Sequence, residues 1–212
     1  NGIKDLIFLG SSCVYPRKSK QPIKEKYLLN SPLEKTNEPY AIAKIAGIKL
    51  CESYNFQYKT NFICLMPCNT YGPNDNYDYE TSHFLPALIR KIYEAKKQNK
   101  KNFVLWGSGK PLREVIFVDD VADACVFFLQ KRVSDYLINI GSNTEMSIKT
   151  YANKIKRILN FNGNIIFDKT KPDGTFRKKQ DLSIAKKYGW YSKISLNQGL
   201  KIAISDFKKR FY

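Results

Sequence analysis

Short apolar runs bounded by turn residues alternate along the chain with longer amphipathic stretches. A short continuous run is typical of a strand buried on both faces, and apolar residues spaced three or four apart are typical of a helix. Strands are therefore predicted at 5–9, 61–66, 102–105, 115–118, 136–140 and 164–167, and helices at 39–58, 83–99, 148–159 and 196–211. Strands that alternate with helices predict an α/β fold with a largely parallel sheet.

Local signals mark where several elements begin. Residues 37–39 read Asn-Glu-Pro, and a proline in the first turn is typical of a helix start. Ser147 is predicted to cap the helix that follows it, and Asp119 or Asp120 to cap a further helix that ends at Leu129. Polar segments rich in Gly, Pro or Asn predict loops at 67–82, 107–111 and 171–178.

The composition is that of a globular protein, with 43% hydrophobic residues. No run of some 18 apolar residues occurs, so we expect no membrane span. A net charge of +17 invites a nucleic-acid-binding interpretation. The lysines are spread along the whole chain, however, and the densest run, 96–101, follows a predicted helix. We interpret the charge as solvated surface that also favours an anionic substrate, and we expect no nucleic-acid partner.

The cysteines stand at positions 13, 51, 64, 68 and 125, with no Cys-x-x-Cys pair and only one histidine. This spacing matches no zinc site, so no metal is predicted. Cys64 and Cys68 lie four apart in an apolar run, which predicts buried thiols. Free thiols are typical of a reducing compartment, and the predicted location is cytoplasmic.

Tyr40 and Lys44 are four residues apart in a predicted helix, so they lie on one face about one turn from each other. A phenol exchanges protons poorly at neutral pH unless a nearby cation stabilises its anion, and Lys44 can supply that cation. Ser11 follows the strand at 5–9, where its hydroxyl could bind a substrate carbonyl. A bare Tyr-x-x-x-Lys also occurs by chance as a half-buried Tyr beside a solvated Lys, so its context decides.

Five segments supply this context: 10–16, 37–47, 66–73, 106–114 and 171–175. In this order and at this spacing they resemble the GDP-L-fucose synthase family of the extended short-chain dehydrogenases/reductases, in which Ser, Tyr and Lys form the working set. The resemblance extends collinearly from about residue 6 to the C-terminus.

The resemblance implies the C-terminal part of a Rossmann-like doubly wound parallel sheet plus a smaller α/β substrate-binding domain. Residues 1–70 would carry the catalytic Ser, Tyr and Lys, and 71–212 would mainly form the substrate-binding domain, with 115–130 returning to the sheet domain. The family opens with a Gly-rich phosphate-binding turn that is absent here. We therefore expect that roughly a hundred residues of the cofactor-binding part precede Asn1.

The resemblance further implies conversion of GDP-4-keto-6-deoxy-D-mannose to GDP-L-fucose by 3,5-epimerisation and NADPH-dependent 4-reduction. Cys13 and His83 would be the acid/base pair of the epimerisation, since a thiol and an imidazole can both remove and supply protons near neutrality. Tyr40 would protonate the new alkoxide, Lys44 would hold the nicotinamide ribose, and Ser11 would polarise the carbonyl. From the sequence alone, Cys13 could also be a buried apolar residue and His83 a helix cap.

The remaining binding residues also follow from the resemblance. NADP(H) would contact Leu9, Gly10, Ser11, Ser12, Tyr40, Lys44, Pro67, Cys68, Asn69, Thr70 and His83. A GDP-sugar would contact Lys91, Trp106, Arg113 and Asp173, because a guanidinium fork suits a diphosphate and a flat ring suits a base or a sugar. Lys91 stands where the family has an arginine, and Asp173 also fits a plain Pro-Asp-Gly turn.

Several alternatives stay open at this point. They are another nucleotide-sugar epimerase or dehydratase of the same superfamily, a catalytically dead fragment of one, and a basic nucleic-acid-binding module. The Cys13 and His83 pair argues against a simple 4-epimerase, which needs no such pair. The resemblance implies a homodimer that pairs through the Tyr-x-x-x-Lys helices, while the choice of NADPH over NADH lies with residues outside this sequence.

Overall fold

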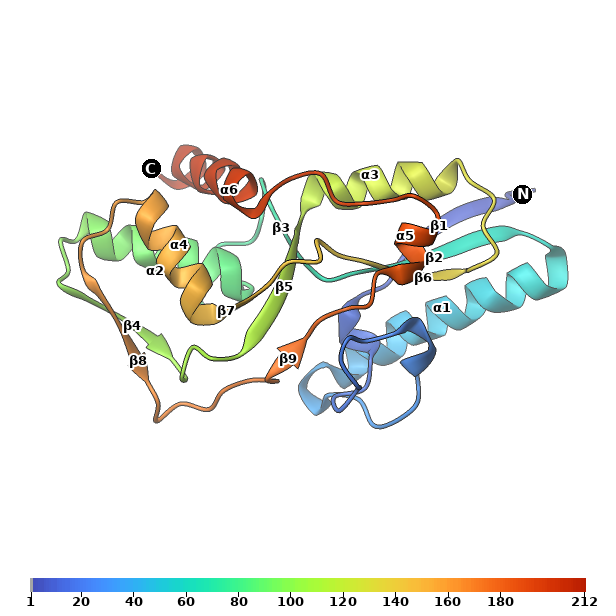
Figure 1. Ribbon diagram of the computed structural model, residues 1–212, viewed down its shortest axis with the longest axis horizontal. Coiled ribbons are helices and arrows are strands. Elements are labelled where there is room, and N and C mark those ends of the chain that lie inside the picture. The colour runs from blue at the N-terminus through green and yellow to red at the C-terminus, as the bar shows by residue number, and fades with distance from the viewer. Residues whose placement is uncertain (1) are drawn as a thin grey trace. The chain divides into compact units, whose positions relative to one another are not determined.

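The computed structural model describes residues 2–212, which form two compact units (Figure 1). Unit 1 comprises the chain up to Thr70 together with Glu114–Thr144 and Lys178–Lys193, and unit 2 comprises Tyr71–Arg113, Glu145–Arg177 and Ile194–Tyr212. The assignment of these units to cofactor and substrate stays a prediction.

Unit 1 is built on a parallel sheet of β1 (Asp5–Leu9), β2 (Asn61–Pro67) and β6 (Leu137–Ile140), in the order β1-β2-β6. Phe8 of β1 pairs with Cys64 of β2, and Cys64 pairs with Leu137 of β6. The central strand β2 is almost wholly buried and β6 is wholly buried, whereas β1 is only partly buried. All three strands were predicted, with bounds that differ by one residue at most.

Helices cover both faces of this sheet, which explains why the apolar run of β2 is continuous rather than alternating. Cys64 and Met66 pack on the side of α1 (Glu38–Tyr58). Ile63 and Leu65 pack on the other side, with α3 (Val118–Leu129) and α5 (Ser183–Lys187). Figure 1 shows α1 and α3 on opposite sides of the strands. The predicted α/β class with a parallel sheet is confirmed.

Helix α1 begins one residue before the predicted start and ends where it was predicted. Ala41, Ile45 and Ile48 are buried at helical spacing and form the stripe that faces the sheet. A Cβ at Gly47 would lie 2.3 Å from the Phe8 ring, so this glycine permits the close approach of α1 to β1. The helix ends at Tyr58, and the C-cap residue Lys59 has a φ of 53°, in the left-handed region.

The predicted cap of α3 is wrong. Strand β5 (Leu112–Phe117) runs directly into the helix, so that Phe117 is the N-cap residue and both Asp119 and Asp120 lie inside the first turn. Asp120 instead accepts a hydrogen bond from the backbone N–H of Lys193 at 2.8 Å. Carboxylates in the first turn of a helix still interact favourably with its dipole, which accounts for the acidic pair.

Unit 2 packs α2 (Phe84–Lys97), α4 (Ile148–Ile158) and α6 (Leu196–Phe211) beside a parallel pair, β4 (Asn102–Trp106) and β8 (Asn164–Asp168). Aromatic rings fill much of its core, with Tyr77 and Phe207 centroids 4.7 Å apart. Ser147 caps α4 as predicted, since its Oγ accepts from the backbone N–H of Thr150 at 3.1 Å.

Short elements were missed. Strands β3 (Asn69–Tyr71) and β9 (Arg177–Lys178) lie in segments that were predicted as loops. They belong to a second sheet with β5 and β7 (Glu145–Ser147), whose strand order is β3-β5-β7 and in which β9 also pairs with β5. Three 3₁₀ turns, at Ser12–Val14, Glu25–Tyr27 and Lys35–Asn37, interrupt the segment between β1 and α1. Within residues 2–212, no helix has the length and apolar character that a membrane crossing requires.

Candidate active site

The candidate site begins in unit 1, where β1 and β2 end side by side. The backbone N–H of Gly10 donates to the carbonyl of Leu65 at 2.8 Å, which extends the strand pairing by one residue. A Cβ at position 10 would lie 2.3 Å from Sδ of Met66, a wholly buried side chain. Glycine is therefore required for the chain to pass this point, and it directs the next residues to the carboxyl edge of the sheet.

Ser11 and Cys13 lie on the 3₁₀ turn that follows. Ser11 is the N-cap residue of the turn, and its Oγ accepts from the backbone N–H of Cys13 at 3.2 Å. Ser12 and Val14 are buried, whereas Cys13 is a free thiol that retains partial exposure. The local fold therefore presents the hydroxyl of Ser11 and the thiol of Cys13 together at the strand end.

The predicted Tyr/Lys pair stands on the first turns of α1. Nζ of Lys44 donates to the carbonyl of Leu9 at 2.9 Å and lies 5.9 Å from the centre of the Tyr40 ring. The same ammonium is 5.2 Å from the centre of the Phe8 ring, so it sits above the end of β1. The Tyr40 side chain is 48% exposed and accessible to a ligand. Unit 1 therefore brings Tyr40 and Lys44 to the strand end from which Ser11 emerges.

The segment after β2 was predicted to meet the nicotinamide. Cys68 is buried, its N–H donates to the carbonyl of Ile140 at 2.9 Å, and burial together with nearby Glu114 raises the pKa of its thiol. The Cys68 side chain thus belongs to the core, and a ligand could reach only its backbone. Nδ2 of Asn69 donates to the carbonyl of Glu114 at 3.0 Å, and Thr70 remains partly exposed. Asn69 and Thr70 are therefore the polar side chains that this segment offers.

In unit 2, His83 is the N-cap residue of α2 and makes no side-chain capping hydrogen bond. Its imidazole is exposed, which leaves it available to a ligand. Asp75 is close enough for the charge of His83 to lower its pKa, although burial is the larger effect and raises that pKa. Sequence reasoning missed Asp75, which carries no signal beyond its place in a polar loop.

The substrate-binding candidates of unit 2 include an exposed tryptophan with two ammonium groups near its ring. Trp106 at the end of β4 is 73% exposed. Nζ of Lys91 lies 5.9 Å from the centre of its ring, and Nζ of Lys171 lies 5.6 Å from it. An aromatic face beside two cations suits a base or sugar that carries phosphate groups. Lys171 was not predicted as a binding residue, although it opens the Lys-Pro-Asp-Gly segment.

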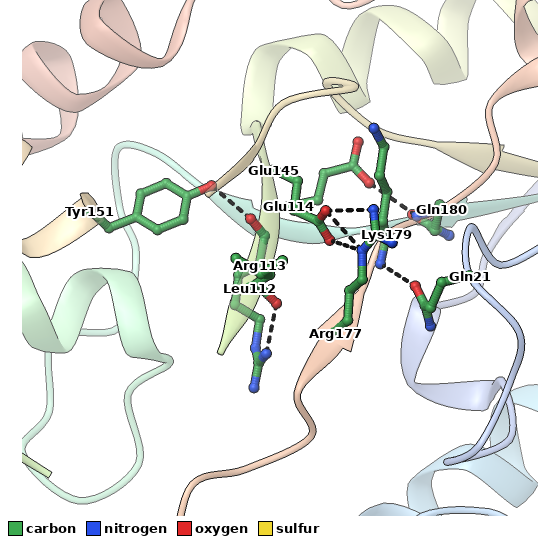
Figure 2. A network of polar contacts seen from close by, with 9 residues as sticks. All are labelled: Gln21, Leu112, Arg113, Glu114, Glu145, Tyr151, Arg177, Lys179 and Gln180. Atoms are coloured by element: carbon green, nitrogen blue, oxygen red, sulfur yellow. Dashed lines mark hydrogen bonds and ion pairs between the residues drawn. The ribbon is translucent and has the colours of Figure 1, made fainter. Parts of the chain in front are cut away.

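Arg113 is held by backbone carbonyls rather than by a carboxylate. Its NH1 donates to the carbonyls of Leu112 at 2.8 Å and Thr175 at 2.7 Å. Figure 2 shows the contact with Leu112, and the hydroxyl of Tyr151 donating to the carbonyl of Arg113 at 2.9 Å. Burial lowers the pKa of the Arg113 guanidinium, while the negative charge of Asp173 raises it. An anion bound here would supply compensating charge to a partly desolvated cation.

Asp173 joins two loops of unit 2. Its carboxylate accepts from the backbone N–H of Ser108 at 2.8 Å and from the Ser108 hydroxyl at 2.6 Å. These hydrogen bonds from Ser108 lower the pKa of Asp173. Gly107 has a φ of 81°, and a Cβ there would lie 2.4 Å from Oδ1 of Asp173. The predicted sugar contact of Asp173 stays a prediction, and the contact that is present orders the loops around Trp106.

Across residues 2–212, the structure contains no group of three or more His, Cys, Asp and Glu side chains arranged to hold a metal ion. The candidate chemical groups form two sets, one in each unit. Unit 1 gathers a hydroxyl, a thiol, a phenol and an ammonium at the carboxyl end of a parallel sheet, where open α/β sheets bind ligands. Unit 2 gathers an aromatic face, two ammonium groups and a guanidinium, and carries His83.

Comparison with known proteins identifies relatives over nearly the whole chain. The model of the NAD dependent epimerase/dehydratase family matches residues 1–141. GDP-L-fucose synthase 1 of Arabidopsis thaliana is 51% identical over 200 residues, which cover 94% of this chain and 62% of the relative. The chain spans about three fifths to two thirds of the length of the curated relatives that it matches first.

Solved structures agree with this finding. A GDP-L-fucose synthetase from Naegleria fowleri bound to NADP is similar with a TM-score of 0.91 and 32% identity, covering 99% of this chain and 68% of that one. A GDP-6-OMe-4-keto-L-xylo-heptose reductase from C. jejuni is similar with a TM-score of 0.90 and 36% identity, covering 99% of this chain and 72% of that one.

Proposed function

Because the chain belongs to the NAD dependent epimerase/dehydratase family, we propose that its gene product makes GDP-L-fucose from GDP-4-keto-6-deoxy-D-mannose. The observation that carries the proposal is the Lys44 ammonium, fixed on the carbonyl of Leu9 beside Tyr40 at the strand end that leads into Ser11 and Cys13. About half of the aligned positions are identical between this chain and GDP-L-fucose synthases, and this similarity supports the choice of substrate.

Epimerisation is the first part of the proposed reaction. The 4-keto group acidifies the C–H bonds at C3 and C5, so that each centre can lose a proton to a base and regain one on the opposite face. We assign these proton transfers to Cys13 and His83, which both retain exposure.

Reduction at C4 is the second part. The carboxyl edge of β1 and β2 fits a nicotinamide cofactor, because open α/β sheets bind ligands at this edge and Lys44 and Asn69 offer polar groups there. NADPH, when bound, supplies a hydride to C4. Ser11 would polarise the carbonyl by a hydrogen bond, and Tyr40 would give its proton to the alkoxide oxygen. Lys44 would stabilise the resulting phenolate and bind the ribose.

The nucleotide part of the substrate is assigned to unit 2. Trp106 would stack on the base or sugar, and Lys91 and Arg113 would bind the diphosphate. Asp173 would bind a sugar hydroxyl in addition to ordering the loops. The proposal includes NADPH as the cofactor, in line with the NADP bound by the Naegleria relative, and a cytoplasmic homodimer that pairs through α1.

The test separates the two parts of the reaction in the full-length gene product. Tyr40→Phe should stop NADPH oxidation while deuterium from solvent still enters C3 and C5. Cys13→Ser and His83→Gln should instead lower the exchange by about 10²-fold or more, the usual effect of losing a general acid or base. Reduction by Tyr40→Phe at a near wild-type rate, or unchanged exchange in both other variants, would refute the assigned roles.

The second candidate is the 4-reduction of a different GDP-linked keto sugar. It is favoured by the similarity to the heptose reductase, which is as good in TM-score as the similarity to a GDP-L-fucose synthetase. Assays with GDP-4-keto-6-deoxy-D-mannose and a GDP-4-keto-heptose distinguish the two. Turnover of the heptose substrate alone, without proton exchange at C3 and C5 of the mannose derivative, would select this candidate.

A further inference from the structure

Unit 1 contains a buried polar network that includes Tyr15, two residues after Cys13. Asn139 of β6 is the centre of this network. The Asn139 side chain is wholly buried, and its Oδ1 accepts from the Tyr15 hydroxyl at 2.6 Å and from Nε2 of Gln180 at 2.9 Å. Its Nδ2 donates to the carbonyls of Ile23 at 3.0 Å and Asp181 at 3.2 Å. The amide therefore has four partners, which are all that its geometry allows.

The network continues from Asn139 to the strand ends that form the site. Nε2 of Gln180 also donates to the carbonyl of Met66 at 2.8 Å, near the end of β2. The backbone N–H of Gln180 donates to the buried carboxylate of Glu114 at 3.2 Å, a contact drawn in Figure 2. The backbone N–H of Asn139 donates to Oε1 of Glu25 at 2.9 Å. These contacts join β2, β5 and β6 to the segment between β1 and α1.

Tyr15 is the link between this network and Cys13. It directly follows the 3₁₀ turn, and its backbone N–H closes that turn on the carbonyl of Ser12 at 3.4 Å. Ser12, Val14 and Tyr15 are buried, and Cys13 is the residue of the turn that retains exposure. The buried residues on either side of Cys13 therefore hold the backbone that directs its thiol.

The hydroxyl of Tyr15 is well suited to hold the turn that carries Cys13. Burial, helped by the nearby charge of Glu25, raises the pKa of Tyr15, so its hydroxyl remains protonated and donates at every pH at which the protein works. A hydrogen bond constrains both distance and direction, whereas apolar packing alone constrains mainly distance. Other contacts hold the candidate reduction groups: Lys44 contacts the Leu9 carbonyl, and Gly10, next to Ser11, pairs with Leu65.

We infer that Tyr15 and Asn139 are positioning residues that hold Cys13 for proton transfer and have little part in hydride transfer at C4. The inference rests on the proposed function, in which Cys13 serves epimerisation alone. Loss of the bond between Tyr15 and Asn139 frees the turn beside Cys13 but leaves Lys44 and Gly10 with their own partners.

The test uses Tyr15→Phe, which keeps the buried ring and removes only the hydroxyl. Its matched control is Tyr188→Phe, because the Tyr188 hydroxyl donates to Oδ2 of Asp135 at the same distance of 2.6 Å in the same unit and meets none of the site residues. Two reactions are measured in the full-length gene product. The first is deuterium entry at C3 and C5 of the keto substrate. The second is oxidation of GDP-L-fucose, in which the C4 hydride passes to NADP⁺ and the hydroxyl proton to Tyr40.

Tyr15→Phe should slow deuterium entry by roughly tenfold or more, because a displacement of about 1 Å can cost up to ~10² in rate. Oxidation of GDP-L-fucose should stay within about threefold, and Tyr188→Phe should alter neither reaction. Equal losses in both reactions, or no loss in either, would overturn the inference. A native protein that catalyses neither reaction would instead refute the proposed function, and the inference with it.

Discussion

The candidate catalytic residues of unit 1 and the candidate substrate residues of unit 2 are held in place by different means. In unit 1, Lys44 is bonded to the carbonyl of Leu9 in β1, and Gly10, the residue before Ser11, is bonded to the carbonyl of Leu65 in β2. In unit 2, Trp106 stands exposed on a two-stranded ribbon, and the loops beside it are joined by Asp173 and Ser108 at the surface.

The difference matches what each set has to do in the proposed reaction. Groups that transfer protons or stabilise charge lose most of their effect when they move by a fraction of an ångström, so they need the rigid sheet. Groups that bind a nucleotide can adjust to it, and exposed loops allow that adjustment. We therefore expect substitutions in unit 1 to change turnover or stability, and those in unit 2, apart from His83 with its proposed role in proton transfer, to change mainly substrate affinity.

The largest expected effect is on the rate of reduction, and it appears when two lysines are compared, one from each unit. Lys44→Met removes the ammonium that serves Tyr40 and should lower the rate of reduction by about 10² to 10⁴, the range for losing general acid-base assistance. Lys91→Met should raise the KM for the GDP-sugar by about threefold and leave kcat unchanged, since an exposed cation contributes little. Steady-state NADPH oxidation at varied substrate measures both values.

Lys49→Met is the control for the first of these variants. Lys49 lies on the same helix, and its Nζ contacts Oε2 of Glu52 at 2.7 Å on the exposed face. Its loss should leave the kinetics unchanged. If Lys44→Met raised only KM, the catalytic role of unit 1 and the contrast between the two units would both be wrong.

The second prediction compares two glycines. A Cβ at Gly141 would lie 2.4 Å from Oε1 of Glu114, whose carboxylate accepts from the backbone N–H groups of Asn143 at 2.7 Å and Gln180 at 3.2 Å. Gly141→Ala should therefore lower the free energy of unfolding by about 1–3 kcal/mol, as overpacking does in a buried site. A Cβ at Gly174 would lie 3.4 Å from NH2 of Arg113 and meet nothing else, so Gly174→Ala should change stability little. Urea unfolding of both variants measures the difference, and equal losses would contradict it.

The third prediction concerns the exposed aromatic ring of unit 2. Trp106→Ala should weaken binding of the GDP-sugar by about tenfold, because stacking on an aromatic ring is worth roughly 1–3 kcal/mol per base. Its high exposure means that the fold should keep its stability. Calorimetric titration with GDP checks the affinity, and thermal unfolding checks the fold. A variant that binds normally but melts early would show that Trp106 is structural.

Local sequence signals were sufficient for the long elements and for the Tyr/Lys pair. The end of α1, the burial of Cys64 and Cys68 and the cap by Ser147 depend on residues close in sequence and were predicted correctly, and the start of α1 was predicted to within one residue. The spacing of Tyr40 and Lys44 on one helix also fixed their proximity in advance.

Features that depend on distant residues could not be predicted in this way. Asn139 contacts Tyr15 across 124 positions and Gln180 across 41, and no local pattern marks these residues as partners. Strand β9 exists only because it pairs with β5. The predicted cap by Asp119 or Asp120 failed because β5 continues directly into α3, which an apolar run cannot reveal.

The smallest expected effect concerns pH and tests how far the rigidity of unit 1 depends on its buried charges. Burial raises the pKa of Glu25 above its ordinary value, although the N–H of Asn139 partly opposes this shift. Folding is then most favourable while Glu25 is protonated, below the pKa of the unfolded chain. This contribution is lost as the pH rises through the higher pKa of the folded state.

Glu25→Gln stays neutral and keeps an oxygen that can accept from Asn139. Its stability relative to the native protein should therefore increase from pH 4 to pH 7 in urea unfolding. A constant difference over that range would mean that Glu25 is solvated well enough to titrate normally, and that its carboxylate adds no buried charge to the polar network around Asn139.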